Sequence, residues 1–341
     1  MAQYKIKITP LQYYFFGGEK HDEEFKINYS VESLDYPQQT TILGMLRYAL
    51  LVHKGWLKGN SIKMDIGDVD GLIGPESFRY GTKENKFGKI KSVSPLYFIH
   101  ENTDYFFAPL DFSFDLNRDF ELSKDGQVYN YKSYGSHIGN CLINQNGVAQ
   151  SLFDIIGEVS QVGNEKAEKG GTKEDAFYKQ KMKKLEDGWS FAVNAEIDLD
   201  LDGLNMNIPF GGEKCIFNIH FEKVEKEKPF TVPANYSRIQ PFIYCISDCF
   251  IDNIDIKNLP FAVTDSVSFR NLKSKTTTKN FYAFKREQNI DNGMVRSSRY
   301  QLLKRGSVLY FDSTEERDKL KAALENNSSR TIGFNQFLTN N

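Results

Sequence analysis

The sequence predicts an α+β protein that is long enough for two packed domains. Its 341 residues are about 40% apolar and 26% charged, values typical of folded globular chains. Short alternating segments outnumber segments with helical periodicity. In the C-terminal part a strand, a helix and a strand follow one another, and this succession is typical of one half of a ferredoxin-like fold.

Alternation with a period of two predicts the strands of the N-terminal part. Apolar and polar residues alternate along each of these segments, which indicates a sheet with one buried face. A glycine-containing turn precedes the last of them. The segments are 4–10, 189–197 and 215–221.

One amphipathic helix is predicted from the apolar residues that recur between Ile42 and His53. Pro37 precedes this pattern at a first-turn position and Gly55 follows it as a stop signal. Its apolar stripe is expected to cover a sheet face. Three polar residues are expected to lie outside that stripe: Gln39, Thr40 and Arg47.

The remaining chain divides into an inserted region, a linker and a C-terminal unit. Glycines, prolines and aromatics interrupt residues 58–160, where we expect inserted strands and hairpins and a short helix within 150–158. The charged segment 222–229 ends in proline and is the best linker. The predicted domains are therefore 1–226 and 227–341.

Beyond the linker the sequence predicts a strand at 307–311, a helix from Thr314 and a last strand in 330–338. Thr314 is expected to be the N-cap, because Glu315 and Glu316 follow it in the first turn.

Several classes of protein are disfavoured by what the sequence lacks. The N-terminus has no signal-peptide pattern and no apolar run reaches about 18 residues, so we expect a cytoplasmic protein without membrane spans. No cofactor motif and no metal-ligand spacing of histidines or cysteines is present. The four cysteines are expected to be buried free thiols: Cys141, Cys215, Cys245 and Cys249.

The charge is distributed unevenly along a chain whose net charge is only -2. Residues 270–305 contain ten lysines or arginines against two acids, and 162–184 contain seven lysines against four acids. Aromatic residues are interspersed in both segments. Such a mixture is typical either of a solvated surface or of a site for single-stranded nucleic acid, whose bases stack and whose phosphates pair with cations.

The segment from Gly211 to Lys214, "GGEK", has two interpretations. Two glycines before a strand form a turn, but such a loop also lets the backbone approach a phosphate, with Lys214 as a cation. For catalysis, only His21 and His137 lie beside glycines in loops, where a general base could act.

The order of several segments resembles a known superfamily. The segments are "YPQQTTILGMLRYALL", "VGNEKAEKGGTKEDAFYKQ", "DGWSFAVNAEIDLD", "IPFGGEKCIFNIHF", "RGSVLYF" and "RTIGF". Together they resemble the RAMP superfamily of CRISPR systems, and within it the third RAMP subunit of type III-B (Cmr) effector complexes. The match is dispersed over most of the chain, and residues 58–160 match only loosely.

This resemblance implies two ferredoxin-like (RRM-like) domains with inserted β-hairpins. It also implies a noncatalytic subunit in antiviral defence, without cofactor or metal, that binds the repeat-derived 5′ tag of the guide RNA. The implied protein partners are the large polymerase-like subunit and the backbone RAMP subunits of the complex.

The resemblance also suggests RNA-binding positions in this chain. Gly211, Gly212 and Lys214 are expected at tag phosphates. The helix start is expected beneath the tag, with Gln39, Thr40, Thr41, Gly44 and Arg47. The further positions expected to contact the tag or a neighbouring subunit are Lys166, Thr172, Phe177, Tyr178, Ser136, His137, Arg296 and Arg299.

Two alternatives remain open from the sequence. One is a metal-independent endoribonuclease that matures the guide precursor, with His21 or His137 as the base. The other is a structural scaffold whose basic segments bind only protein partners.

Overall fold

The structure is a computed structural model of the chain. It describes residues 1–17, 29–58, 61–82, 84, 86–112, 120–122, 129–131, 141–166, 172–225, 230–251, 259–274 and 294–340. We refer to residues 1–225 as the N-terminal half and to residues 230–340 as the C-terminal half.

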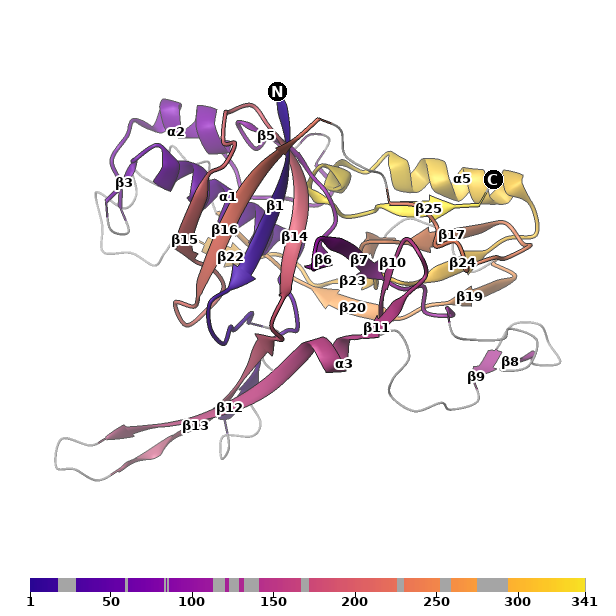
Figure 1. The fold of residues 1–341 in the computed structure, drawn as a ribbon, viewed down its shortest axis with the longest axis horizontal. Coiled ribbons are helices and arrows are strands. Elements are labelled where there is room, and N and C mark those ends of the chain that lie inside the picture. The colour runs from indigo at the N-terminus through magenta and orange to yellow at the C-terminus, as the bar shows by residue number, and fades with distance from the viewer. Residues whose placement is uncertain are drawn as a thin grey trace.

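A nine-stranded sheet, antiparallel throughout, forms the centre of the N-terminal half (Figure 1). Its strand order is β11-β10-β7-β6-β14-β1-β16-β15, and β5 also pairs with β14. The three strands predicted from alternation are its centre, β14, β1 and β16. The bounds are β1 (Ala2–Pro10), β5 (Ile90–Val93), β6 (Tyr97–His100), β7 (Thr103–Phe107), β10 (Cys141–Asn144), β11 (Ala149–Ser151), β14 (Trp189–Ile197), β15 (Asn205–Pro209) and β16 (Ile216–Val224).

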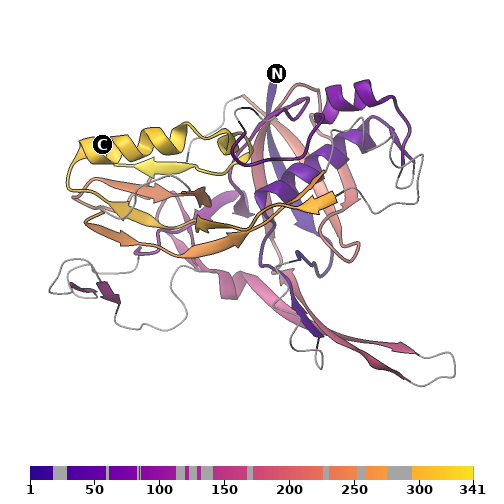
Figure 2. The same cartoon turned by 180° about the vertical axis from the view of Figure 1, so that it is seen from behind.

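Helices α1 (Gln39–His53) and α2 (Ile66–Ile73) cover one face of this sheet (Figures 1 and 2). The predicted apolar stripe is buried, with Ile42 and Leu46 fully buried in the same apolar cluster as Ile6 and Ile8 of β1. The helix ends before Gly55, whose φ angle of +67° lies in the left-handed region that stops helices. The short helix expected within 150–158 is α3 (Leu152–Ile155).

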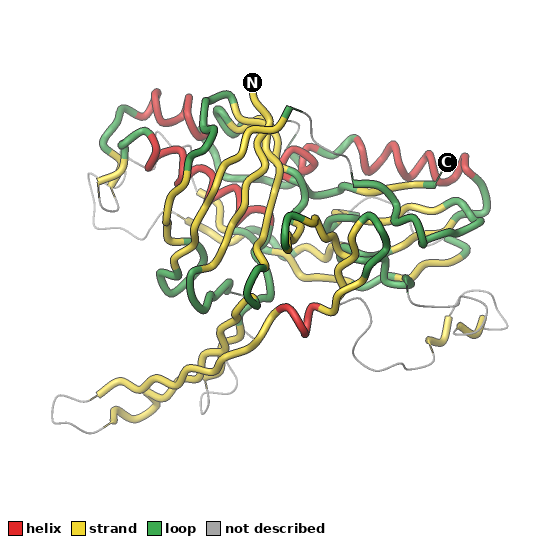
Figure 3. The backbone as a smooth tube through the Cα atoms, viewed as in Figure 1, coloured by secondary structure: helices red, strands yellow, loops and turns green. Residues whose placement is uncertain are grey.

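A long hairpin projects from the body of the molecule (Figure 3). It consists of β12 (Ile156–Lys166) and β13 (Thr172–Leu185), and β2 (Tyr29–Glu32) pairs in parallel with β13 near its base. We call it the arm. It contains the described part of the lysine-rich segment 162–184, and six of the seven lysines lie on its strands, while Lys169 is outside the described residues.

The C-terminal half contains a four-stranded sheet in the order β19-β24-β17-β25, with α5 (Thr314–Glu325) leading from β24 to β25. A three-stranded sheet, β18-β23-β20, lies beside it. The bounds are β17 (Phe242–Cys245), β18 (Cys249–Phe250), β19 (Phe261–Val263), β20 (Ser266–Phe269), β23 (Tyr300–Leu303), β24 (Val308–Tyr310) and β25 (Phe337–Thr339).

Three two-stranded pairs complete the described elements. They are β3 (Leu57–Lys58) with β4 (Ser61–Ile62), β8 (Phe120–Leu122) with β9 (Tyr129–Tyr131), and β21 (Leu272–Ser274) with β22 (Met294–Arg296). The expected inserted hairpins are therefore present, although the arm lies mostly beyond residue 160.

Two predicted details of the C-terminal half are wrong. The N-cap of α5 is Ser313, whose hydroxyl accepts a hydrogen bond from the Glu316 N–H at 3.3 Å, and Thr314 is the first helical residue. The segment predicted as the last strand begins with a 3₁₀ helix, η2 (Ser328–Ile332), because the Asn327 side chain caps it by accepting the Ser329 N–H. The strand starts only at Phe337.

The mixed α/β architecture with mostly antiparallel sheets agrees with the predicted fold class. In the nine-stranded sheet, β1 and β6 lie on either side of β14, and the chain between them contains α1. In the four-stranded sheet, β24 and β25 lie on either side of β17, and the chain between them contains α5. Each is a split β-α-β unit of the ferredoxin-like type. In the described residues no helix connects β14 with β16, and α5 is the only α-helix of the C-terminal half, so two complete domains of this type are not established.

The two halves share a buried core. The largest apolar cluster contains most of the N-terminal core together with Phe250, Phe269 and Phe334 of the C-terminal half. The ring of Tyr80 stacks on Phe250 with 4.0 Å between ring centres. The described residues form no helix that is both long and apolar enough to cross a membrane.

Candidate nucleic-acid interface

The "GGEK" segment forms the turn between β15 and β16. The φ angles of Gly211, Glu213 and Lys214 are +82°, +54° and +55°, all in the left-handed region. A Cβ atom on Gly211 would lie 2.6 Å from the carbonyl oxygen of Phe15, which accepts the Gly212 N–H at 2.7 Å. Both positions therefore require glycine because a Cβ atom at either one would clash with Phe15, as the turn interpretation predicts. Lys214, on this turn, is exposed.

A cavity of about 390 Å³ separates this turn from helix α1. Its volume lies in the range of small-ligand sites, roughly 300–1,000 Å³. The cavity joins segments that are about 170 positions apart in the sequence, and four of its residues were predicted: Gly211, Gly212, Thr41 and Gly44. The remaining lining residues are Phe16, Gly17, Leu34, Gln38, Met45, Tyr48, Pro209 and Phe210.

The start of helix α1 gives this cavity a positive end. Gln38 is the N-cap residue but its side chain makes no capping hydrogen bond, and the first turn contains no acidic residue. Unsatisfied N–H groups and the helix dipole both favour an anion at such an end. The cavity thus combines aromatic walls with a helix N-terminus, and Lys214 lies on the same turn as two of its residues.

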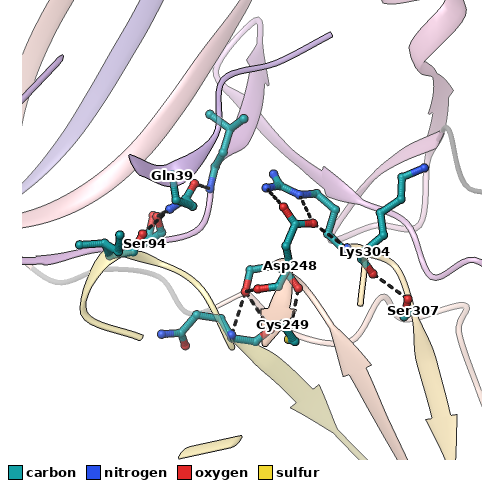
Figure 4. Close-up of polar contacts among 11 residues, drawn as sticks. Gln39, Ser94, Asp248, Cys249, Lys304 and Ser307 are labelled. Carbon is teal, nitrogen blue, oxygen red and sulfur yellow. Dashed lines mark hydrogen bonds and ion pairs between the residues drawn. The ribbon is translucent and has the colours of Figure 1, made fainter. Parts of the chain in front are cut away.

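Gln39 and Arg47, which were expected beneath the tag, do not line this cavity. Gln39 is 1% exposed, and its amide donates to the carbonyl oxygens of Ser94 at 2.9 Å and Ile332 at 2.6 Å (Figure 4). The Oε1 atom of Gln39 accepts a hydrogen bond from the Leu96 N–H at 3.1 Å. The side-chain amide of Gln39 therefore makes all of these hydrogen bonds with residues that are distant from it in the sequence.

Arg47 supports the packing of α1 on the segment after α2. Its Nη2 donates to the Glu76 carbonyl oxygen at 2.7 Å, and its Cζ lies 5.2 Å from the ring centre of Phe87. Burial lowers the pKa of Arg47 to about 10. Thr40 is half-buried on α1 and does not line the cavity.

The base of the arm is connected to the cavity through two short segments. The Tyr14 and Lys183 backbones exchange hydrogen bonds of 2.8 and 2.9 Å, two residues before Phe16. Ser33, which precedes the cavity residue Leu34, donates its N–H to the Lys181 carbonyl oxygen at 3.0 Å. A ligand in the cavity would therefore lie beside the root of the arm.

The other predicted positions are spread over the molecule. On the arm, Asn164 is paired with Phe177 and Gly163 with Tyr178, while Lys166 is opposite Thr172 near the tip. Arg296 and Arg299 are exposed at and after β22 and do not line the cavity. Ser136, His137 and His21 lie outside the described residues.

The sequence reasoning missed the aromatic walls of the cavity. Tyr48 is seven residues after Thr41 and four after Gly44, so helical spacing places all three on one face. Phe210 directly precedes the glycine turn, and Phe16 directly precedes Gly17. The helical spacing was a usable signal for Tyr48. Among the described residues no group of three potential ligands is placed to hold a metal ion.

Two solved structures that share this fold are described as type III-B Cmr-β complexes bound to cognate target RNA. One is from "Cryo-EM structure of the Type III-B Cmr-beta bound to cognate target RNA", with a TM-score of 0.53, 14% identity and coverage of 98% of each chain. Another is from the same complex with cognate target RNA and AMPPnP in state 1, with a TM-score of 0.51, 16% identity and coverage of 98% of this chain and 95% of that one. At 14% and 16% identity, this similarity shows that the chains share a fold and nothing more.

The family follows from the sequence itself. A family model described as CRISPR-associated protein (Cas_Cmr3) matches residues 6–132 and 154–341, and the chain belongs to this family. This confirms the predicted kinship with a subunit of type III-B systems. No curated protein sequence matches the chain.

Proposed function

We propose that this chain is a noncatalytic subunit of a type III-B RNA-guided effector complex and that it holds the 5′ tag of the guide RNA. Family membership and the shared fold with chains of RNA-bound Cmr-β complexes support the class. The observation that carries the RNA role is the cavity, which unites the glycine turn and the exposed face of α1.

In this proposal one tag nucleotide occupies the cavity. Its base lies against the aromatic wall that includes Tyr48, and its phosphate lies near the N-terminus of α1 and Lys214. The neighbouring nucleotides pass the root of the arm, where Lys179 and Lys184 are exposed. Phe177, Tyr178, Lys166 and Thr172 then contact the tag or a neighbouring subunit from the arm.

The charge of the chain agrees with binding inside an assembly. With a net charge of -2, the isolated chain has no large positive field to attract RNA. About six phosphate contacts to a single strand would give a log–log salt slope of roughly -4. We therefore expect weak binding by the chain alone and strong binding once the large polymerase-like subunit and the first backbone subunit complete the groove.

Filling the cavity from Gly44 tests this function without disturbing the fold. A Cβ atom on Gly44 meets nothing within 4 Å, and leucine is a better helix former than glycine, so Gly44→Leu should fold normally. In the reconstituted complex it should reduce affinity for guide RNA with an intact tag about 5- to 150-fold, the equivalent of one stacked base at about 1–3 kcal/mol. Electrophoretic binding with intact and scrambled tags measures this.

Gly71→Leu is the matched control, because Gly71 is also an exposed helical glycine with nothing within 4 Å of a Cβ atom. It should leave tag discrimination unchanged. If Gly44→Leu discriminates between the tags as well as the control does, the cavity does not hold the tag. Substituting Gly211 is a poorer test, since the clash with Phe15 would disturb the turn itself.

A further inference from the structure

Two short stretches of chain, 14–17 and 33–36, lie between the root of the arm and the cavity. They are joined to each other, because the Leu34 N–H donates to the Phe16 carbonyl oxygen and the Phe16 N–H donates to the Ser33 hydroxyl, both at 2.8 Å. Phe16 and Leu34 line the cavity. The two stretches therefore form one wall of the cavity.

Tyr14 connects this wall to the arm. Its side chain is fully buried, and its backbone exchanges hydrogen bonds of 2.8 and 2.9 Å with Lys183 of β13. Its ring centre lies 5.2 Å from the ring centre of Phe16. Its hydroxyl donates to the Asp35 carbonyl oxygen at 2.7 Å. Tyr14 thus contacts the arm, the cavity wall and the chain that leads to α1.

Asp35 is held a second time, by a side chain of the arm. Its carboxylate lies 3.0 Å from the Nζ atom of Lys183, whose side chain is only 16% exposed. In the sequence, Asp35 directly follows the cavity residue Leu34 and lies three positions before the cavity residue Gln38. Lys183 therefore acts on Asp35 by two routes, directly through its ammonium group and indirectly through Tyr14.

We propose that this junction, formed by Tyr14, Asp35 and Lys183, couples the arm to the cavity; this rests on the tag binding proposed above. A nucleotide in the cavity fixes the wall at Phe16 and Leu34 and so orders the root of the arm. Coupling between two sites is reciprocal, so a neighbouring subunit that holds the arm strengthens binding in the cavity by the same factor, typically about 5- to 150-fold. The arm therefore regulates tag binding from a distance.

The variant Tyr14→Phe tests the junction without removing a group that touches the ligand, because the Tyr14 side chain is fully buried. In the reconstituted complex it should lower the affinity for guide RNA with an intact tag by about fivefold or more. Tyr4→Phe is the matched control, since Tyr4 is also fully buried, its hydroxyl donates to the Leu199 carbonyl oxygen at 2.9 Å, and neither residue lines the cavity. It should bind within about twofold of wild type, because distant sites without shared partners act independently.

Variants of Lys183 separate coupling from a direct contact with phosphate. Lys183→Met removes the ion pair with Asp35 and should weaken binding of the intact tag more than binding of a scrambled tag. Lys183→Arg keeps the charge and should restore most of the affinity. In the wild-type complex, guide RNA with an intact tag should slow amide exchange in residues 179–185, and the effect should be smaller in Tyr14→Phe.

The outcomes distinguish this inference from the proposed tag binding. Equal losses of affinity in Tyr14→Phe and Tyr4→Phe would reflect a general loss of stability and would overturn the coupling. Amide exchange at 179–185 that the intact tag does not change, while Gly44→Leu loses tag discrimination, would also overturn it and would leave the cavity as the tag site. Equal losses for both tags in Lys183→Met would assign this lysine to phosphate contacts instead. If Gly44→Leu discriminates as well as its control, the proposed function fails and the coupling fails with it.

Discussion

At the scale of single residues, buried polar side chains tie together segments that are distant in sequence. Gln39 lies at the start of α1, yet its amide partners are at Ser94, Leu96 and Ile332. A buried amide is costly unless each group is paired, and here both directions of hydrogen bonding are used. Gln39 thus fixes the start of α1, and with it the helix turn that lines the cavity.

We expect Gln39→Leu to lower the free energy of unfolding by about 1–3 kcal/mol, because it leaves two carbonyl oxygens and one N–H buried without partners. Urea unfolding followed by circular dichroism measures the change. Gln161→Leu, at an exposed position of the arm, is the control and should change stability by less than about 0.5 kcal/mol. A Gln39→Leu variant as stable as the control would show that the amide contacts contribute nothing net.

At the scale of elements, the direction of the arm is set at its base. Lys181 is paired with Glu32 of β2 and with Glu158 of β12, and Lys183 lies 3.0 Å from Asp35 and 3.2 Å from Glu158. Burial alone would raise the pKa of Glu158, but the hydrogen bonds and charges of Lys183 and Lys181 outweigh it and lower that pKa. These ion pairs join the arm to the segment that precedes α1.

The lowered pKa of Glu158 predicts how the base of the arm responds to acid. A carboxyl whose pKa is lower in the folded state contributes stability above its unfolded pKa, about 4.3, and loses that contribution as the pH falls through the folded value. Amide exchange in the pairs of β12 with β13 should therefore be constant from pH 8 to 5, after correction for intrinsic rates, and should rise below pH 4.

Glu158→Gln should show faster exchange at pH 7, close to what the wild type shows in acid, and high salt should reduce the difference. Glu196→Gln, on the central strand β14 and away from the arm, is the control. Equal exchange in Glu158→Gln and wild type at every pH would mean that backbone pairing alone sets the arm.

Elements with a strong periodic pattern were predictable from the sequence. β1, β16 and α1 each bury one face, and burial of one face is what creates the period. In β14 the residues on both faces are buried over 189–193, and burial alternates only beyond them. The N-cap of α5 was misassigned by one residue, because Ser313 and Thr314 are both good caps and only the backbone at Ser313 is extended. The 3₁₀ turn at 328–332 lacks a period and was missed.

The candidate site was predictable only in part, because a cavity is a tertiary feature. Gly211, Gly212, Thr41 and Gly44 were selected from the resemblance and meet at the cavity. The same reasoning selected Gln39, whose burial depends on Ser94 and Ile332, 55 and 293 positions away. No local pattern in the sequence indicates contacts at such separations, and Phe16 and Phe210 could not be predicted for the same reason.

At the scale of the whole molecule, the two halves form one packed body. Arg305 of the C-terminal half is 1% exposed and packs against the rings of Tyr36 and Phe107, with Cζ 4.8 and 4.7 Å from their centres. Its Nη2 is 2.7 Å from the carboxylate of Asp248, whose polar contacts Figure 4 shows. The predicted boundary between residues 226 and 227 therefore separates two segments of the sequence, but the largest apolar cluster contains residues from both of them.

This shared core predicts one cooperative unfolding transition for the whole chain. Phe250 packs on Tyr80 and on Phe334 within the cluster that contains β1 and α1, so loss of packing in one half exposes apolar surface of the other. Calorimetry should give a single peak with a calorimetric enthalpy equal to the van't Hoff enthalpy.

Phe250→Ala should lower the stability of that one transition by about 3–5 kcal/mol, whereas Phe153→Ala, at an exposed position, should change it by less than about 0.5 kcal/mol. Two separate peaks, with Phe250→Ala moving only one of them, would instead show that residues 227–341 unfold as an independent domain.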